Sequence, residues 1–239
     1  MDFKKELLNL NLNIDDVMLD KFEIFYNELI RVNEYMNLTA ITEHDEVYIK
    51  HFFDSLTVLG CIDNNENVKL LDFGSGAGFP AIPLAIVSNI DITIIDALNK
   101  RINFLNETIA KLKLNNVKAL HKRAEDYVKE KAGFYDYTIA RAVARLNILL
   151  ELCLPLTKVG GYFIAMKSNA YNEELDEAKN ALNILGGRVE KIIELDLPLD
   201  MGKRTIILIK KIKETPKKYP RLFAKIKEKP LWFIKWMKL

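Results

Sequence analysis

Seven short apolar runs follow one another from residue 69 onward, and they constrain the fold more than any other feature. The runs occupy residues 69–73, 91–96, 117–120, 137–140, 162–167, 189–195 and 205–209. Helix-compatible segments at 80–88, 100–114, 124–130 and 146–156 separate the first five runs. Buried runs that alternate with helices indicate an α/β fold whose parallel sheet is covered on both faces. About nine residues separate the last two runs, too few for a helical crossover, so these two are predicted to pair antiparallel.

The residues before the first run are predicted to be helical. Apolar residues between 15 and 37 recur at steps of three and four, which is typical of an amphipathic helix. A second helix is predicted over 43–59, with Thr42 as its N-cap and Asp45 in its first turn. A turn-forming cluster at 63–67 follows. We therefore expect three parts: a helical section at 1–67, an α/β domain at 68–212 and a basic extension at 213–239.

The composition is that of a packed globular protein. Hydrophobic residues make up 49% of the 239 residues and charged residues 28%, which argues against disorder and fibrous folds. Cys61 and Cys153 lie far apart, so neither a disulfide framework nor a metal-cluster motif is present and a reducing compartment is favoured. No stretch approaches the roughly 18 apolar residues of a membrane span, and no signal-peptide pattern is found. We expect a cytoplasmic protein.

Positive charge is concentrated at the C-terminus. Residues 210–239 hold ten Lys and one Arg against two Glu, a net charge of +9, which leaves −7 for the rest of a chain whose total is +2. Aromatic residues stand among these lysines, namely Tyr219, Phe223, Trp232, Phe233 and Trp236. This mixture suits phosphate contacts and base stacking, so the tail suggests nucleic acid. A solvated extension or a membrane-surface segment remains open on composition alone.

A glycine-rich loop is the sharpest local motif. Residues 70–80 run from an apolar strand through Gly74, Gly76 and Gly78 into a helix that Pro80 is placed to begin. In an open parallel sheet, ligands bind at this edge. The spacing is Gly-x-Gly-x-Gly with Phe79 next, so the dinucleotide fingerprint Gly-x-Gly-x-x-Gly is not met.

An acidic residue closes the next predicted strand. Asp96 lies 22 residues after Gly74, the place from which a carboxylate binds ribose hydroxyls. The loop and the acid together predict a nucleoside ligand. The choice lies between a nicotinamide or flavin dinucleotide and S-adenosylmethionine.

The segment from Asp72 to Pro80 resembles the first motif of the seven-stranded S-adenosylmethionine-dependent methyltransferases. The chain as a whole more closely resembles the bacterial small-subunit (16S) ribosomal RNA guanine-7-methyltransferase family, also called glucose-inhibited division protein B. The matching segments are 37–40, 51–56, the glycine loop through Ala85, 96–101, 123–125, 140–142, Gly160-Gly161 with Lys167, and 215–221. The resemblance implies a Rossmann-like methyltransferase sheet at 68–212, with the helical section before it and the basic tail after it.

The resemblance also implies a set of cofactor residues. It places S-adenosylmethionine, and its product S-adenosylhomocysteine, against Gly74, Gly76, Gly78, Phe79 and Asp96. The resemblance places the adenine of the cofactor beside Ala124 and Glu125. Arg141 matches the family's cofactor-contacting arginine, and Arg141 and Lys167 are expected to act in catalysis by positioning rather than as acid or base. Core packing is an equal alternative for Phe79.

The chemistry of the target agrees with this family. Residues 140–143 lack the Asp/Asn-Pro-Pro-aromatic motif of many amine methyltransferases, and Cys153 lies in a Leu-rich run that favours a buried thiol over a nucleophile. Guanine N7 carries an in-plane lone pair and needs no base to remove a proton. Proximity and orientation are therefore expected to carry catalysis.

Candidates for binding RNA phosphates and the target guanine are basic residues that we expect at the ligand-binding edge of the sheet or in the tail. They are Lys100, Arg101, Arg123, Lys167, Arg204, Lys217, Lys218 and Arg221. His51 and Asp54 stand three residues apart in the second predicted helix. For this pair we expect a structural hydrogen bond that joins the helical section to the sheet, and no metal.

The sequence thus predicts an S-adenosylmethionine-dependent methyltransferase that acts on 16S rRNA or on the small ribosomal subunit, as a monomer and away from membranes. A small-molecule methyltransferase of the same fold, a non-catalytic nucleotide-binding module and a nicotinamide enzyme are the alternatives.

Overall fold

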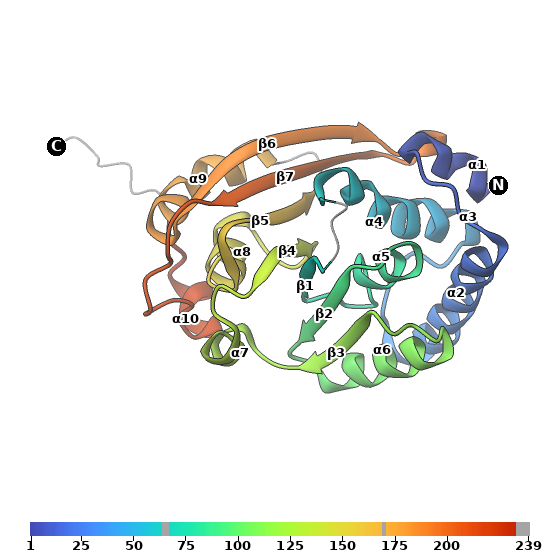
Figure 1. Cartoon of the computed structure of the whole chain (residues 1–239), viewed down its shortest axis with the longest axis horizontal. Coiled ribbons are helices and arrows are strands. Elements are labelled where there is room, and N and C mark those ends of the chain that lie inside the picture. The colour runs from blue at the N-terminus through green and yellow to red at the C-terminus, as the bar shows by residue number, and fades with distance from the viewer. Residues whose placement is uncertain (64–66, 169–170, 233–239) are drawn as a thin grey trace. The chain divides into compact units, whose positions relative to one another are not determined.

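The computed structural model describes residues 1–63, 67–168 and 171–232, and it confirms the predicted α/β fold. The seven strands form one sheet in the order β3-β2-β1-β4-β5-β7-β6. They are β1 (Lys69–Phe73), β2 (Asp91–Asp96), β3 (Val117–His121), β4 (Tyr135–Arg141), β5 (Thr157–Lys167), β6 (Gly187–Asp196) and β7 (Lys203–Lys211). β6 and β7 are neighbours and run in opposite directions, as predicted (Figure 1).

Two helical predictions need correction. α2 (Asp16–Met36) is confirmed, with Asp15 accepting a hydrogen bond from Met18 N at 2.7 Å. The second helix is capped by Glu43 rather than Thr42, because the Glu43 carboxylate accepts from Glu46 N at 2.9 Å. It is also not one regular helix. It passes through α3 (His44–Val47), the π-helical η2 (Tyr48–Phe53), α4 (Asp54–Leu56) and the 3₁₀-helical η3 (Thr57–Cys61).

The remaining helices follow the predicted alternation, with further elements near both chain ends and between the last three strands of the sequence. The predicted crossover helices are α5 (Ala81–Val87), α6 (Asn99–Lys111), α7 (Ala124–Lys131) and α8 (Leu146–Cys153). The additions are α1 (Phe3–Leu7) with η1 (Leu8–Leu10), α9 (Tyr171–Leu185) and α10 (Phe223–Glu228); η4 (Pro198–Asp200) lies between β6 and β7. α9 has a weak apolar stripe, since only Ala178, Ala181 and Leu185 are buried, which explains why its sequence pattern was missed.

The chain divides into two compact units. The first comprises Met1–His121 and Leu195–Arg204. Within it, β1 pairs parallel with β2 and β2 with β3, while α2 packs against α5 and α6 (Figure 1). Aromatic rings fill the space between the N-terminal helices, with Phe22, Phe25 and Phe52 fully buried.

The second unit comprises Lys122–Glu194 and Thr205–Leu239. β4 pairs parallel with β5, and β5 pairs antiparallel with β7. α8 packs against α9, α7 and α10. The division of the sequence at residues 67/68 and 212/213 stays a prediction about domains.

Candidate functional site

A buried acid fixes the position of the glycine loop. Asp72 is fully buried, and its Oδ2 accepts hydrogen bonds from Ser75 Oγ at 2.6 Å and from Ala81 N at 3.0 Å. These bonds tie the end of β1 to the loop and to the first turn of α5. The loop is also joined to β2, because Gly74 N donates to Ile95 O at 2.9 Å.

The glycines of the loop serve two different purposes. A Cβ at Gly78 would lie 2.7 Å from Ile82 Cγ1 and 3.0 Å from Leu105 Cδ2, so Gly78 is needed for close packing. A Cβ at Gly76 would meet nothing within 4 Å, although its φ of +61° also favours glycine. The space beside Gly76 is therefore open to a ligand that approaches the backbone.

Asp96 ends β2 beside this loop. The parallel register pairs Phe73 with Ile95, so the carboxyl ends of β1 and β2 lie side by side. Asp96 is only 6% exposed; its Oδ1 accepts from Leu98 N at 2.8 Å, and its Oδ2 lies 3.4 Å from Arg101 Nη1. A carboxylate held in this way is preorganised to accept hydrogen bonds from a ligand.

Phe79 follows the loop but its ring faces the protein interior. The ring is 4% exposed and stacks on His51, with centroids 4.5 Å apart, and it also packs near Phe25 at 5.3 Å. The alternative of core packing therefore describes its side chain. His51 in turn bonds to Thr39 Oγ1 through Nε2 at 2.8 Å, within the helical section. Ring stacking thus links His51 to the glycine loop.

Asp54 makes the expected link between the helical section and the sheet. Its carboxylate is buried, and its Oδ2 lies 3.1 Å from Nε of Arg204. This ion pair joins α4 to the start of β7 within the first unit.

In the second unit, the predicted residues lie at two places. Arg123 occupies the N-cap position of α7, Ala124 is buried in the first turn, and Glu125 Oε1 accepts a hydrogen bond from Phe223 N at 3.5 Å. Arg141 and Lys167 end the paired strands β4 and β5, so the structure brings these two to one edge.

The Arg141 edge contains an unusual backbone. Ala142 follows β4 with φ of +55°, a left-handed conformation that is costly for any residue with a Cβ. Lys167 Nζ donates to Ala144 O at 2.7 Å and to Glu174 Oε2 at 2.6 Å. Lys167 therefore braces the backbone that follows Arg141.

The eight candidate RNA-binding residues fall into two groups. Four are ion-paired with acids of the protein: Arg101 with Asp96, Lys167 with Glu174, Arg204 with Asp54, and Arg221 with Glu151. The other four, Lys100, Arg123, Lys217 and Lys218, have exposed side chains. The sequence analysis singled out Asp96 and Asp54 but not Glu174 or Glu151, although Glu151 stands in a run of leucines, a pattern that signals a buried charge.

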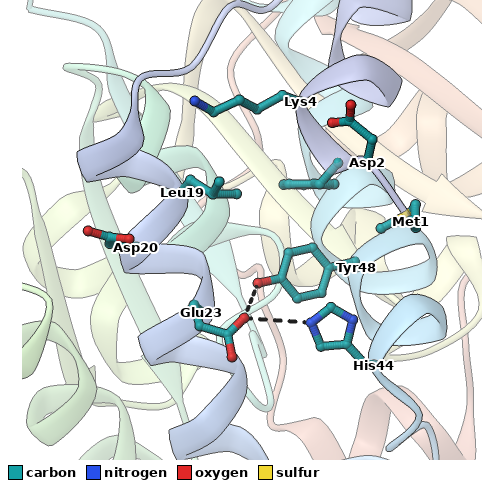
Figure 2. Close-up of a pocket in the computed structure, with 9 residues that line it drawn as sticks. Met1, Asp2, Lys4, Leu19, Asp20, Glu23, His44 and Tyr48 are labelled. Carbon is teal, nitrogen blue, oxygen red and sulfur yellow. Dashed lines mark hydrogen bonds and ion pairs between the residues drawn. The ribbon is translucent and has the colours of Figure 1, made fainter.

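One cavity of about 490 Å³ lies elsewhere in the first unit, and none of the predicted site residues lines it. Figure 2 shows Glu23 pointing to Tyr48 and His44; the Tyr48 hydroxyl donates to Glu23 at 2.8 Å, and His44 Nε2 lies 3.6 Å away. Burial, and then this hydrogen bond, raises the pKa of Tyr48. The lining carboxylate of Glu23 is thus already bound by neighbouring side chains.

Among residues 1–63, 67–168 and 171–232, no group of three or more His, Cys, Asp or Glu side chains is placed to hold a metal ion. No helix within the same residues has the length and apolar character to cross a membrane.

Solved structures share this fold. A SAM-dependent methyltransferase from Aquifex aeolicus is 17% identical, aligned over 77% of this chain and 97% of that chain, with a TM-score of 0.51. The YcgJ protein from Bacillus subtilis is 14% identical, aligned over 68% and 100%, with a TM-score of 0.50. The sheet order and the glycine loop are those of the Rossmann-like methyltransferase fold.

Sequence relatives define the family within that class. A model of the GidB family, rRNA small subunit methyltransferase G, matches residues 18–205. Ribosomal RNA small subunit methyltransferase G of Bacillus cytotoxicus is 49% identical over 222 residues, 92% of this chain and 93% of the relative. The same values hold for the protein of that name from Bacillus anthracis. The chain belongs to the rRNA small subunit methyltransferase G family and is an rRNA methyltransferase, which confirms the resemblance.

Proposed function

We propose that this enzyme transfers the methyl group of S-adenosylmethionine to N7 of one guanine in 16S rRNA, either free or in the small ribosomal subunit. The assignment of this cofactor rests on the open space beside the Gly76 backbone and on the preorganised carboxylate of Asp96. The family resemblance supports the target base. An enzyme that acts on ribosomal RNA is expected in the cytoplasm, and we propose a monomer.

In the first unit, we assign the cofactor contacts to the backbone of the glycine loop and to one acidic side chain. Gly74 and Gly76 permit close approach to the methionine and ribose parts, and Asp96 accepts hydrogen bonds from ribose hydroxyls. Gly78 keeps the loop packed against α5 and α6. Since the Phe79 ring is packed inside the protein, we assign any cofactor contact at this position to its backbone. The bound cofactor supplies a methyl group made electrophilic by its sulfonium.

The second unit supplies the residues that the family places at the adenine and the reacting centre. Ala124 and Glu125 are assigned to the adenine side, and Arg141 to the cofactor. Lys167 supports Arg141 by holding the Ala144 carbonyl while Glu174 neutralises its charge. Arg141 and Lys167 therefore contribute to catalysis by positioning the reactants and not as acid or base.

The reaction requires no general base. With S-adenosylmethionine bound, the N7 lone pair would form a bond to the methyl carbon while the carbon–sulfur bond breaks and leaves its electron pair on sulfur. No proton leaves the guanine in this step, and the base becomes cationic. The protein's own task is to hold the purine in line and to exclude water, which converts a bimolecular reaction into an effectively unimolecular one.

The exposed cations are assigned to the RNA. Lys100, Arg123, Lys217 and Lys218 contact phosphates, because their charges are available at the surface. The ion-paired residues Arg101, Arg204 and Arg221 are assigned to the protein's own architecture.

The decisive experiment measures labelled methyl transfer to small ribosomal subunits, and separately to naked rRNA, from cells that lack this gene. Mass spectrometry of the nucleosides should find 7-methylguanosine at a single site. Label at another atom or base would overturn the N7 assignment. Cofactor binding without transfer to either RNA would favour the small-molecule methyltransferase.

A further inference from the structure

The C-terminal segment, defined here as residues 213–229, is fastened to the second unit by one arginine. Arg221 makes three hydrogen bonds to the carboxylate of Glu151 in α8: from its backbone N at 3.0 Å, from Nε at 2.7 Å and from Nη2 at 2.6 Å. Glu151 is fully buried. A two-nitrogen contact to a buried carboxylate is geometrically demanding, and removing Arg221 would strand a buried charge.

Further contacts hold the segment along its length. Thr215 Oγ1 donates to Leu185 O at 2.8 Å, and Phe223 N donates to Glu125 at 3.5 Å. Tyr219 is 8% exposed, and Ile226 of α10 is fully buried. The segment is therefore folded onto α7, α8 and the end of α9 rather than extending as a free arm.

The outer side of this docked segment is strongly basic. Six lysines in it are exposed: Lys213, Lys217, Lys218, Lys225, Lys227 and Lys229. The only acids in the segment are Glu214 and Glu228. Across the part of the chain that the structure describes, none of the six forms an ion pair, in contrast to Arg221. Their charges stay available to a partner.

We infer that Arg221 is the anchor of this segment, and that the six lysines form a preorganised basic surface that contacts phosphates of the RNA substrate. The choice of RNA as partner rests on the proposed function. Docking fixes the lysine backbone positions before binding, so less conformational entropy is lost than with a flexible tail. Each phosphate neutralised releases counterions, which makes affinity depend on salt.

The experiment uses the full chain and a fragment of small-subunit rRNA. Lys217, Lys218, Lys225 and Lys227 are changed together to Gln, and the matched control changes four exposed lysines elsewhere: Lys5, Lys113, Lys118 and Lys191. Affinity is measured between 50 and 200 mM salt. The slope of log affinity against log salt should fall by roughly 2 to 4 in the segment variant, at about 0.7 to 0.9 per lost phosphate contact, and little in the control. Equal slopes in the two variants would overturn the surface.

A second pair of variants tests the anchor. Arg221→Lys keeps the positive charge but loses the two-nitrogen contact to Glu151. If Arg221 anchors the segment, this variant should raise hydrogen exchange at 213–229, as Arg221→Gln should, and it should weaken RNA binding. Arg221→Lys with unchanged exchange and affinity would show that only its charge matters. The double variant Glu151→Gln/Arg221→Gln leaves no unpaired buried charge. Raised exchange and weakened RNA binding in this variant therefore cannot come from misfolding caused by that charge.

Two controls separate this inference from the proposed function. If the wild-type protein methylates rRNA while the salt slopes are equal, the surface is wrong and the function stands. If the protein binds RNA with the expected slopes but transfers no methyl group, the reaction assignment fails instead. Binding to anionic lipid vesicles in preference to the rRNA fragment would overturn RNA as the partner.

Discussion

The carboxylate of Asp96 lies 3.4 Å from the guanidinium of Arg101, five residues further along the chain. The acid proposed to bind ribose thus has a counter-ion at one oxygen and a backbone amide at the other. We therefore propose that Arg101 orients the carboxylate of Asp96 through this ion pair.

Asp96→Asn should weaken binding of S-adenosylhomocysteine by about 10- to 100-fold, because hydrogen bonds to a charged group contribute roughly 1.5–3 kcal/mol. Arg101→Gln should weaken it less, and should have no further effect in the Asp96→Asn background. Isothermal titration calorimetry of both single variants and the double variant provides the measurement. Additive losses would show that Arg101 acts independently of Asp96.

The buried carboxylate of Asp72 holds the glycine loop, so its loss should be costly. Asp72→Ala leaves Ala81 N and Ser75 Oγ without their acceptor, at about 1–3 kcal/mol for each buried group. We expect the free energy of urea-induced unfolding to fall by roughly 2–6 kcal/mol. Ser75→Ala, which removes one of the two bonds, should cost clearly less. Similar losses in both variants would show that the Ala81 bond contributes little.

Gly76 and Gly78 should separate binding from stability. Gly78→Ala places a Cβ against Ile82 and Leu105 and should lower the free energy of unfolding by about 1–3 kcal/mol. Gly76→Ala meets no atom within 4 Å and should cost only about 1 kcal/mol for its positive φ. It should nevertheless reduce S-adenosylhomocysteine affinity, because the methyl group occupies the open space. Unchanged affinity in folded Gly76→Ala would argue against cofactor approach at this residue.

Lys211 should make stability rise at alkaline pH. The side chain is 1% exposed, its Nζ donates to Thr157 O at 2.6 Å, and burial lowers its pKa from 10.5 to about 8, with Glu214 opposing the shift. Below pH 8 both folded and unfolded chains hold the proton, so the cost of burying the charge is complete. Between pH 8 and 10.5 only the unfolded chain holds it, so stability rises with pH.

Comparison with Lys211→Met isolates this effect. The unfolding free energy of the wild type, relative to the variant, should increase by about 3 kcal/mol from pH 8 to 10.5, at about 1.4 kcal/mol per pKa unit. Urea unfolding at several pH values provides the measurement. Parallel pH profiles for the two proteins would mean that Lys211 titrates normally in the folded state.

The sequence by itself determined the fold class and the family. Apolar runs that alternate with helical segments are a local signal, because each strand must be buried on both faces. The seven strands therefore appear where the pattern placed them, although β5 begins at Thr157, five residues before its apolar run. The glycine loop and Asp96 were also predictable, since turn chemistry and strand ends are local features.

Only the tertiary structure decided which charges are available. Arg101, Arg204 and Arg221 look equivalent to Lys100 and Lys217 in sequence, yet each of the three meets an acid that lies 5 to 150 residues away. The direction of the Phe79 ring was equally undetermined, because His51 reaches it through packing rather than spacing. These contacts join side chains that the fold brings together, most of them from distant parts of the chain, so no local sequence pattern indicates them.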